Sequence, residues 1–140
     1  MRKKEEEELH DKAVDEIAKQ EFPFPTKSHP NWKTYTNHPK QNMGVEIKNQ
    51  KPVYPDIVVV DAEKKKAEMI GEVETASTVN EDHAAQWKEY SSLSTFFLYI
   101  PKNYVSEASR ILNLMRIPLA YSALRTYEFD AQSKIIISTA

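Results

Sequence analysis

Apolar side chains recur with a helical period in three stretches of the chain. In the first stretch, Leu9, Ala13 and Ile17 stand four residues apart, so they would form one stripe that faces a core. In the second stretch, Asn80 precedes two acidic residues and can cap a helix N-terminus. The predicted helices are residues 3–20, 80–93 and 104–117.

Short apolar or alternating runs predict six strands. They are residues 44–49, 53–61, 68–75, 94–100, 119–129 and 134–139. The second and third strands would form one hairpin, and the last two strands would form a closing hairpin. This order of elements predicts a single domain over residues 1–140, of the α/β (α+β) class, with a mixed central sheet flanked by helices.

The composition excludes several kinds of chemistry. The chain has 140 residues, no cysteine and only two glycines, Gly44 and Gly71. Disulfide scaffolds, thiolate metal sites and cysteine nucleophiles are therefore excluded, and no glycine-rich nucleotide loop can be written. The N-terminus lacks an apolar signal region, and no run reaches the about 18–20 apolar residues that a membrane helix needs. We therefore expect a cytoplasmic protein with no membrane partner.

The charge is distributed unevenly, although the net charge is only −2. Residues 26–51 contain five lysines and one acid, a local charge of +4, so the rest of the chain carries −6. Prolines interrupt this segment and predict a loop inserted before the strand at 53–61. Lysines among aromatic residues suit phosphate contacts and base stacking, whereas a plain surface loop with aromatics anchored in the core is the alternative. The predicted nucleic-acid-binding residues are Lys27, Lys33, Lys40, Lys48, Lys51, Trp32 and, on the helix at 80–93, Lys88.

Three carboxylates on the first hairpin are the most informative feature of the sequence. Asp56, Glu72 and Glu74 stand on strands that are otherwise largely apolar, where acidic residues are unusual. Two carboxylates about 4 Å apart repel by ~4 kcal/mol at an effective dielectric constant of about 20. Such a group persists when it is protonated, neutralised by basic side chains or bound to a hard cation such as Mg²⁺ or Mn²⁺. Exposed acids paired with lysines are the alternative.

The spacing of these acids resembles the motif of the PD-(D/E)XK nucleases, the restriction-endonuclease-like superfamily. Pro55 and Asp56 are followed, after fifteen residues, by Glu72-Val73-Glu74. The predicted order of elements from about residue 3 to 102 is also similar to the αβββαβ core of that superfamily. The pair Gln86 and Tyr90 matches the QxxxY pattern of its RecB-type members.

The resemblance implies a role for each matched position. Asp56 and Glu72 would ligate Mg²⁺ or Mn²⁺, with the Val73 carbonyl as a further ligand. An acid of the first helix, Glu16 or Asp15, would lie near the metal, and we choose Glu16 because it neighbours the apolar stripe. Glu74 occupies the position where the superfamily usually has lysine, so it would act as a general base or join the ligands of a second metal ion. Gln86 and Tyr90 would orient the DNA.

These observations predict a metal-dependent nuclease that hydrolyses phosphodiester bonds, with DNA favoured over RNA. A binding module of the same fold that has lost cleavage is one alternative, supported by the missing lysine. A small structural domain with surface ion pairs is another. The sequence leaves a homodimer open, with residues 135–137 as a candidate edge.

Overall fold

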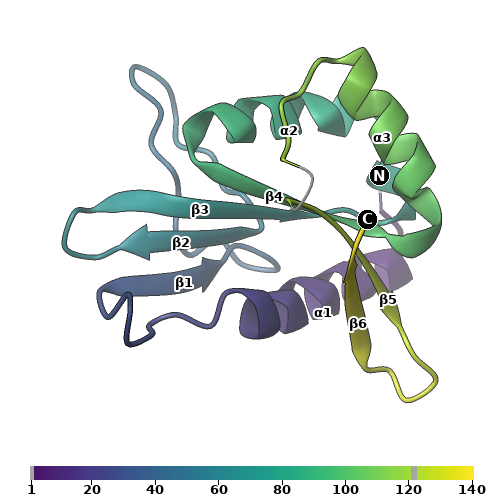
Figure 1. The fold of residues 1–140 in the computed structure, drawn as a ribbon, viewed down its shortest axis with the longest axis horizontal. Helices are drawn as coiled ribbons and strands as arrows, with labels where there is room; N and C mark the ends of the chain where they lie inside the picture. The colour runs from purple at the N-terminus through teal and green to yellow at the C-terminus, as the bar shows by residue number, and fades with distance from the viewer. Residues whose placement is uncertain (1, 121–122) are drawn as a thin grey trace.

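The computed structural model describes residues 2–120 and 123–140, which form a six-stranded mixed sheet and three α-helices (Figure 1). The helices are α1 (Lys4–Glu21), α2 (Glu81–Leu93) and α3 (Val105–Leu114), and the short 3₁₀ helices are η1 (Ala76–Thr78) and η2 (Lys102–Tyr104). The strands are β1 (Trp32–Thr36), β2 (Ile57–Asp61), β3 (Lys66–Val73), β4 (Thr95–Pro101), β5 (Leu124–Phe129) and β6 (Ile135–Thr139).

The strands follow one another across the sheet in the order β1-β2-β3-β4-β5-β6. β1, β2 and β3 are antiparallel, β3, β4 and β5 are parallel, and β6 returns antiparallel to β5. α2 connects β3 to β4, and α3 connects β4 to β5, because parallel neighbours need a crossover connection. The α+β class and the mixed sheet predicted from the sequence are thus confirmed.

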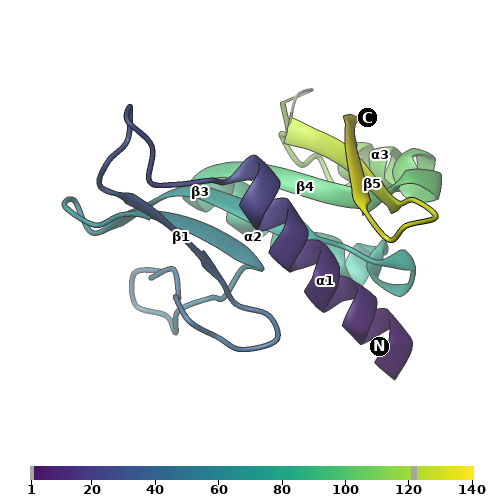
Figure 2. The ribbon, with the colours of Figure 1, turned by 90° about the horizontal axis from the view of Figure 1, so that it is seen from below.

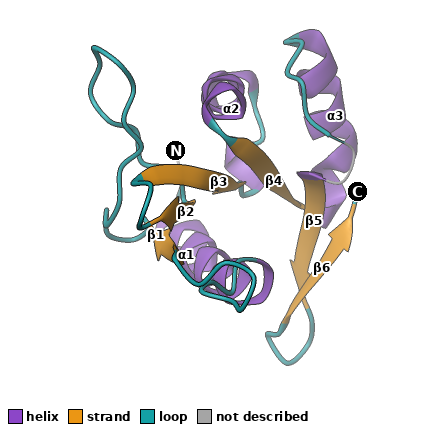
Figure 3. Cartoon of the chain, turned by 60° about the vertical axis from the view of Figure 1, so that its left-hand side comes forward, coloured by secondary structure: helices purple, strands orange, loops and turns teal. Residues whose placement is uncertain are grey.

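The sheet separates two apolar cores. α1 packs against one face through Ala13, Val14 and Ile17. Figure 2 shows that this helix crosses the sheet obliquely. α2 and α3 cover the other face, where Trp87 is the largest fully buried side chain. Figure 3 shows α1 and α2 on opposite sides of the sheet. Because the two faces of β2 and β3 meet different helices, side chains at the ends of these strands are enclosed from both sides.

Most predicted elements are found within a few residues of their predicted bounds. Asn80 caps α2 as expected, since its side chain accepts a hydrogen bond from the His83 backbone N–H at 2.9 Å. No described helix combines the length and the apolar character that crossing a bilayer requires. Residues 121–122 of the predicted strand 119–129 lie outside the described residues.

The first strand was predicted in the wrong place. Residues 44–49 form only a single bridge, between Val45 and Val53, whereas the strand lies at Trp32–Thr36. Its alternating sequence WKTYT fits a strand, but the surrounding prolines led us to expect a loop. The structure accommodates them because the strand ends before Pro39 and pairs with β2.

The last strand is a sheet edge, as the homodimer prediction requires. Ile135 is buried in the core below α1, and Ile137 packs against the same core. Ile136 is exposed. Burial within the monomer therefore accounts for two of the three isoleucines, and the dimer stays a prediction.

Candidate metal centre

The three acids of the hairpin come together at one end of β2 and β3. Asp56 directly precedes β2, Glu72 is the second-to-last residue of β3, and Glu74 directly follows β3. Antiparallel pairing places Ile57 opposite Gly71, so the start of β2 and the end of β3 are neighbours. All three acids are buried, with exposed fractions of 9%, 7% and 1% for Asp56, Glu72 and Glu74. The alternative, in which these three acids lie on the surface and pair with lysines, is therefore wrong.

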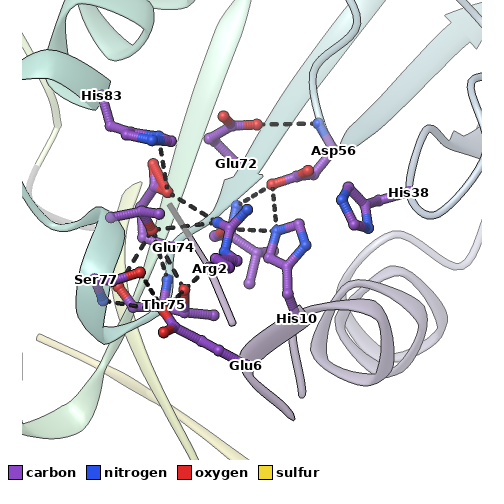
Figure 4. Close-up of polar contacts among 12 residues, drawn as sticks. Arg2, Glu6, His10, His38, Asp56, Glu72, Glu74, Thr75, Ser77 and His83 are labelled. Carbon is purple, nitrogen blue, oxygen red and sulfur yellow. Dashed lines mark hydrogen bonds and ion pairs between the residues drawn. The ribbon is translucent and has the colours of Figure 1, made fainter. Parts of the chain in front are cut away.

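Asp56 is held as a carboxylate by two N–H donors. Its Oδ2 accepts hydrogen bonds from the Val73 backbone N–H at 2.8 Å and faces His10 Nε2 at 3.2 Å (Figure 4). Burial would raise the pKa of Asp56, but the hydrogen bond and charge of His10 and the Val73 N–H outweigh it and lower the pKa. Asp56 therefore ionises more readily than an ordinary aspartate despite its burial.

The pKa of Glu72 is shifted in the direction opposite to that of Asp56. Its Oε1 accepts a hydrogen bond from the Asp56 backbone N–H at 3.0 Å. Burial, followed by the charges of Asp56 and Glu74, raises the pKa of Glu72 well above its usual value. The pKa values of these two buried carboxyl groups are therefore shifted in opposite directions, so Asp56 loses its proton more readily than Glu72.

Glu74 is fixed by a separate set of donors. Trp87 Nε1 donates to Glu74 Oε2 at 2.6 Å, and His83 Nδ1 lies 3.7 Å from Oε1. The Tyr127 hydroxyl donates to the backbone carbonyl of Glu74 at 2.5 Å. Burial raises the pKa of Glu74 to about 7, although the Trp87 hydrogen bond opposes the increase.

An arginine from the N-terminus reaches this cluster. The Arg2 guanidinium lies 3.4 Å from Glu74 Oε1 and donates to Thr75 Oγ1 at 2.7 Å and to Thr78 Oγ1 at 3.2 Å (Figure 4). Glu6 binds the same turn, since its Oε2 accepts from the Ser77 hydroxyl at 2.6 Å. Arg2 thus supplies a cation beside the buried Glu74 carboxylate.

The α1 residue that lies beside Asp56 is a histidine, His10, and not the predicted Glu16. Glu16 lies six residues after His10 on α1, about 9 Å along the helix axis, and its charge acts on Lys19. His10 instead occupies the place beside Asp56, and it also lies 2.9 Å from the Val73 carbonyl that was predicted as a metal ligand. Helical phase could have identified His10, because residues 10, 13, 14 and 17 share one face. Leu9, which we assigned to the buried stripe, is 41% exposed.

The two α2 residues of the QxxxY pattern have different surroundings. Tyr90 is buried, packs edge-on against Phe96, and has a raised pKa caused by burial and then by the charge of Glu72. Gln86 and the predicted phosphate-binding residue Lys88 are exposed. Tyr90 therefore belongs to the wall of the carboxylate cluster, and Gln86 is open to a ligand from solvent.

Among the residues that the structure describes, Arg2, His10, His83 and Trp87 contact the three acids through their side chains, and none of the predicted lysines does so. Lys33 lines a groove of about 770 Å³ together with Lys65 and Lys66, near the opposite end of β2 and β3. The other lysines of residues 26–51 are exposed, namely Lys27, Lys40, Lys48 and Lys51. Trp32 stacks on His29 with ring centroids 3.7 Å apart and also packs against Phe24, so its ring is already in contact with other rings.

Asp56, Glu72 and Glu74 are neighbours, but each is turned towards a protein donor. Among the residues that the structure describes, the group whose candidate ligand atoms all lie within 4.8 Å of one another is His10, Asp11 and His38. A cation at Asp56 and Glu72 would have to compete with the N–H groups that these carboxylates accept from, namely those of Val73 and Asp56. Comparison with protein-family models, curated proteins and solved structures gives no match to this chain.

Proposed function

We propose that this protein is a metal-dependent nuclease that cleaves phosphodiester bonds, with DNA favoured over RNA and Mg²⁺ or Mn²⁺ as its cofactor. The observation that carries this proposal is the burial of Asp56 and Glu72 side by side at one end of the β2–β3 hairpin, where the Asp56 backbone N–H donates to Glu72 Oε1 at 3.0 Å. In this proposal the fold is that of the restriction-endonuclease-like core.

The ligand chemistry of this pair favours a hard divalent cation. A buried carboxylate pair is costly unless a positive charge accompanies it, and carboxylate and carbonyl oxygens suit Mg²⁺ and Mn²⁺. Asp56, Glu72 and the Val73 carbonyl would hold the ion. Once bound, such an ion stabilises the negative charge that develops on a phosphate under attack.

The remaining residues of the cluster would act on the nucleophile and on the charge balance. Glu74, with a pKa of about 7, is suited to accept a proton near neutral pH. Arg2 lies beside it and offsets the extra negative charge of a glutamate at this position. Gln86 would contact the nucleic acid from α2, and Lys33, Lys65 and Lys66 would contact phosphates further along the hairpin.

Cleavage of plasmid, single-stranded and branched DNA in Mg²⁺ or Mn²⁺ tests the proposal. Wild-type protein should cleave at least one of these substrates, and Glu72→Gln should reduce the rate at least 100-fold. Glu68→Gln, on the same strand but outside the cluster, is the matched control and should cleave like wild type. A wild-type protein that cleaves none of the three would exclude a deoxyribonuclease of this kind.

A catalytically inactive module that binds nucleic acid or a protein is the second candidate. It is favoured by Glu74, which stands in place of the usual lysine and is bound to Trp87 and Arg2. A module of this kind would bind DNA with a strong salt dependence, and Glu72→Gln would leave that binding unchanged. DNA binding without cleavage would support this candidate over the nuclease.

A further inference from the structure

One nitrogen of His10 is buried without a partner. The His10 side chain is 1% exposed, and its Nε2 lies 2.9 Å from the Val73 carbonyl oxygen. A carbonyl only accepts hydrogen bonds, so Nε2 carries a proton, and in the neutral ring that a metal ion requires the lone pair stands at Nδ1. Among the residues that the structure describes, Nδ1 has no hydrogen-bond partner. A buried polar atom without a partner destabilises the folded chain, and a ligand bound at Nδ1 would remove that cost.

Further ligand groups surround this ring. Asp11 is the next residue on α1, and His38 comes from the loop after β1, with its ring centroid 4.3 Å from that of His10 (Figure 4). One candidate ligand atom from each of His10, Asp11 and His38 lies within 4.8 Å of the others. Glu7, one turn before on the same face of α1, has its Oε2 3.4 Å from His38 Nε2. The group therefore offers two imidazoles and two carboxylates.

The loop that carries His38 is anchored from within. The buried side chain of Asn37 donates to the carbonyls of Met43 and Pro55, both at 2.7 Å. Its Oδ1 accepts from the backbone N–H groups of Asn42 and Met43 at 2.7 and 2.8 Å. Because every polar atom of the Asn37 side chain has a partner, the backbone of His38 is held in place before any ligand binds.

Protonation of His38 would account for the contacts of His38 but not for Nδ1 of His10, which is unpaired among the described residues. A protonated His38 would satisfy both carboxylates that it meets, Asp11 at Nδ1 and Glu7 at Nε2. That proton does nothing for His10 Nδ1. A metal ion bound between the two rings would satisfy His10, Asp11 and His38 together.

We propose that His10 Nδ1, Asp11 and His38 bind one Zn²⁺ ion, with Glu7 as a peripheral fourth group. Two imidazoles with a carboxylate are a ligand set that suits Zn²⁺ better than Mg²⁺. Ligands at about 2.0–2.2 Å in a tetrahedron lie roughly 3.4 Å apart, so modest movements of the partly exposed Asp11 and His38 side chains complete the site. Binding requires neutral imidazoles and releases to solvent any proton that His38 holds. This site does not depend on the proposed nuclease activity.

The bound ion would act on Asp56 through the histidine. Coordination at Nδ1 fixes the His10 tautomer with the proton at Nε2, where it faces Asp56 Oδ2 at 3.2 Å. Histidine ligands of metals commonly donate their other N–H to a carboxylate or a carbonyl, as His10 does here.

Zn²⁺ titration of the metal-free full chain in excess Mg²⁺ tests this proposal. Calorimetry should show one Zn²⁺ ion per chain, and His38→Asn and Asp11→Asn should each weaken binding at least tenfold. His29→Asn and Asp15→Asn are the matched controls, since they change another loop histidine and the aspartate one turn further along α1, and both should bind like wild type. Equal Zn²⁺ affinity in wild type and His38→Asn would overturn the site.

Nitrogen NMR of the histidine rings gives a second readout on the wild-type protein. The His10 Nδ1 resonance should shift on Zn²⁺ addition, while Nε2 keeps its proton. A His10 Nδ1 resonance that does not move at saturating Zn²⁺ would overturn the proposal, whatever the calorimetry shows.

Discussion

The two candidate metal sites lie on either side of one histidine, and they differ in chemistry and in exposure. The Asp56–Glu72 cluster offers oxygen atoms only and is buried. The cluster of Glu7, His10, Asp11 and His38 offers two imidazoles, and its carboxylates are 34–42% exposed. One face of α1 therefore borders two proposed sites, one that suits Mg²⁺ or Mn²⁺ and one that suits Zn²⁺.

The two clusters also satisfy their charges in different ways. Asp56 and Glu72 are buried and accept hydrogen bonds from backbone N–H groups, so removing a carboxyl group changes the charge of a closed environment. Solvent reaches the side chains around His38, so changes there are screened. We therefore expect substitutions in the buried cluster to have the larger effects.

We expect the substitution Glu72→Gln to produce the largest difference between the metal affinities of the two clusters. It removes one ligand of the proposed Mg²⁺ or Mn²⁺ site and none of the proposed Zn²⁺ site. Mn²⁺ affinity should fall at least 100-fold, while Zn²⁺ affinity stays within twofold of wild type, both measured by calorimetry. A parallel loss of both metals would mean that the two clusters are not distinct sites.

Glu74→Gln should change the pH dependence of stability in the metal-free protein. Because the pKa of Glu74 is raised to about 7, the folded state keeps a proton that the unfolded state loses above its ordinary pKa. The free energy of unfolding therefore decreases as pH rises towards 7 and levels off above it, by about 3 kcal/mol for this shift. Urea unfolding at pH 5 and pH 8 should show this decrease in wild type and a smaller one in Glu74→Gln. The same decrease in both proteins would show that Glu74 is not responsible.

His10→Ala should affect both clusters, because His10 borders both. It removes a proposed Zn²⁺ ligand and one donor to Asp56, so Zn²⁺ binding should be lost and Mn²⁺ affinity should fall by about 10–100-fold. Circular dichroism and thermal unfolding establish that the variant is folded before metals are added. Unchanged Mn²⁺ affinity in a folded His10→Ala protein would remove the link between the clusters.

The smallest effect is expected from Glu7→Gln. Glu7 is 42% exposed and lies 3.4 Å from His38 Nε2, at the open side of the histidine cluster. Zn²⁺ affinity should decrease by less than tenfold, and Mn²⁺ affinity should not change. A loss as large as that of His38→Asn would make Glu7 a principal ligand instead of a peripheral one.

The sequence predicted those parts of the structure that follow local periodicity. Alternation along two strands joined by a short turn was enough to bring Asp56, Glu72 and Glu74 to one end of a hairpin. The cap of α2 at Asn80 and the order of helices and strands depend on short-range patterns of the same kind.

The missed residues depend on contacts between distant segments. Arg2 is 72 residues from Glu74, and a long side chain at a helix N-terminus gives no periodic signal. His10 was overlooked because hydropathy selected Leu9 for the buried stripe, although the buried face begins one residue later. His38 reaches α1 only because Asn37 anchors its loop, which no local pattern indicates.

Anomalous X-ray scattering from crystals soaked in Mn²⁺ tests the central claim most directly. The account predicts one Mn²⁺ peak within coordination distance of carboxylate oxygens of Asp56 and Glu72, and no such peak in Glu72→Gln crystals. Crystals with saturating Mn²⁺ and no peak between Asp56 and Glu72 would contradict the proposed metal-dependent nuclease site.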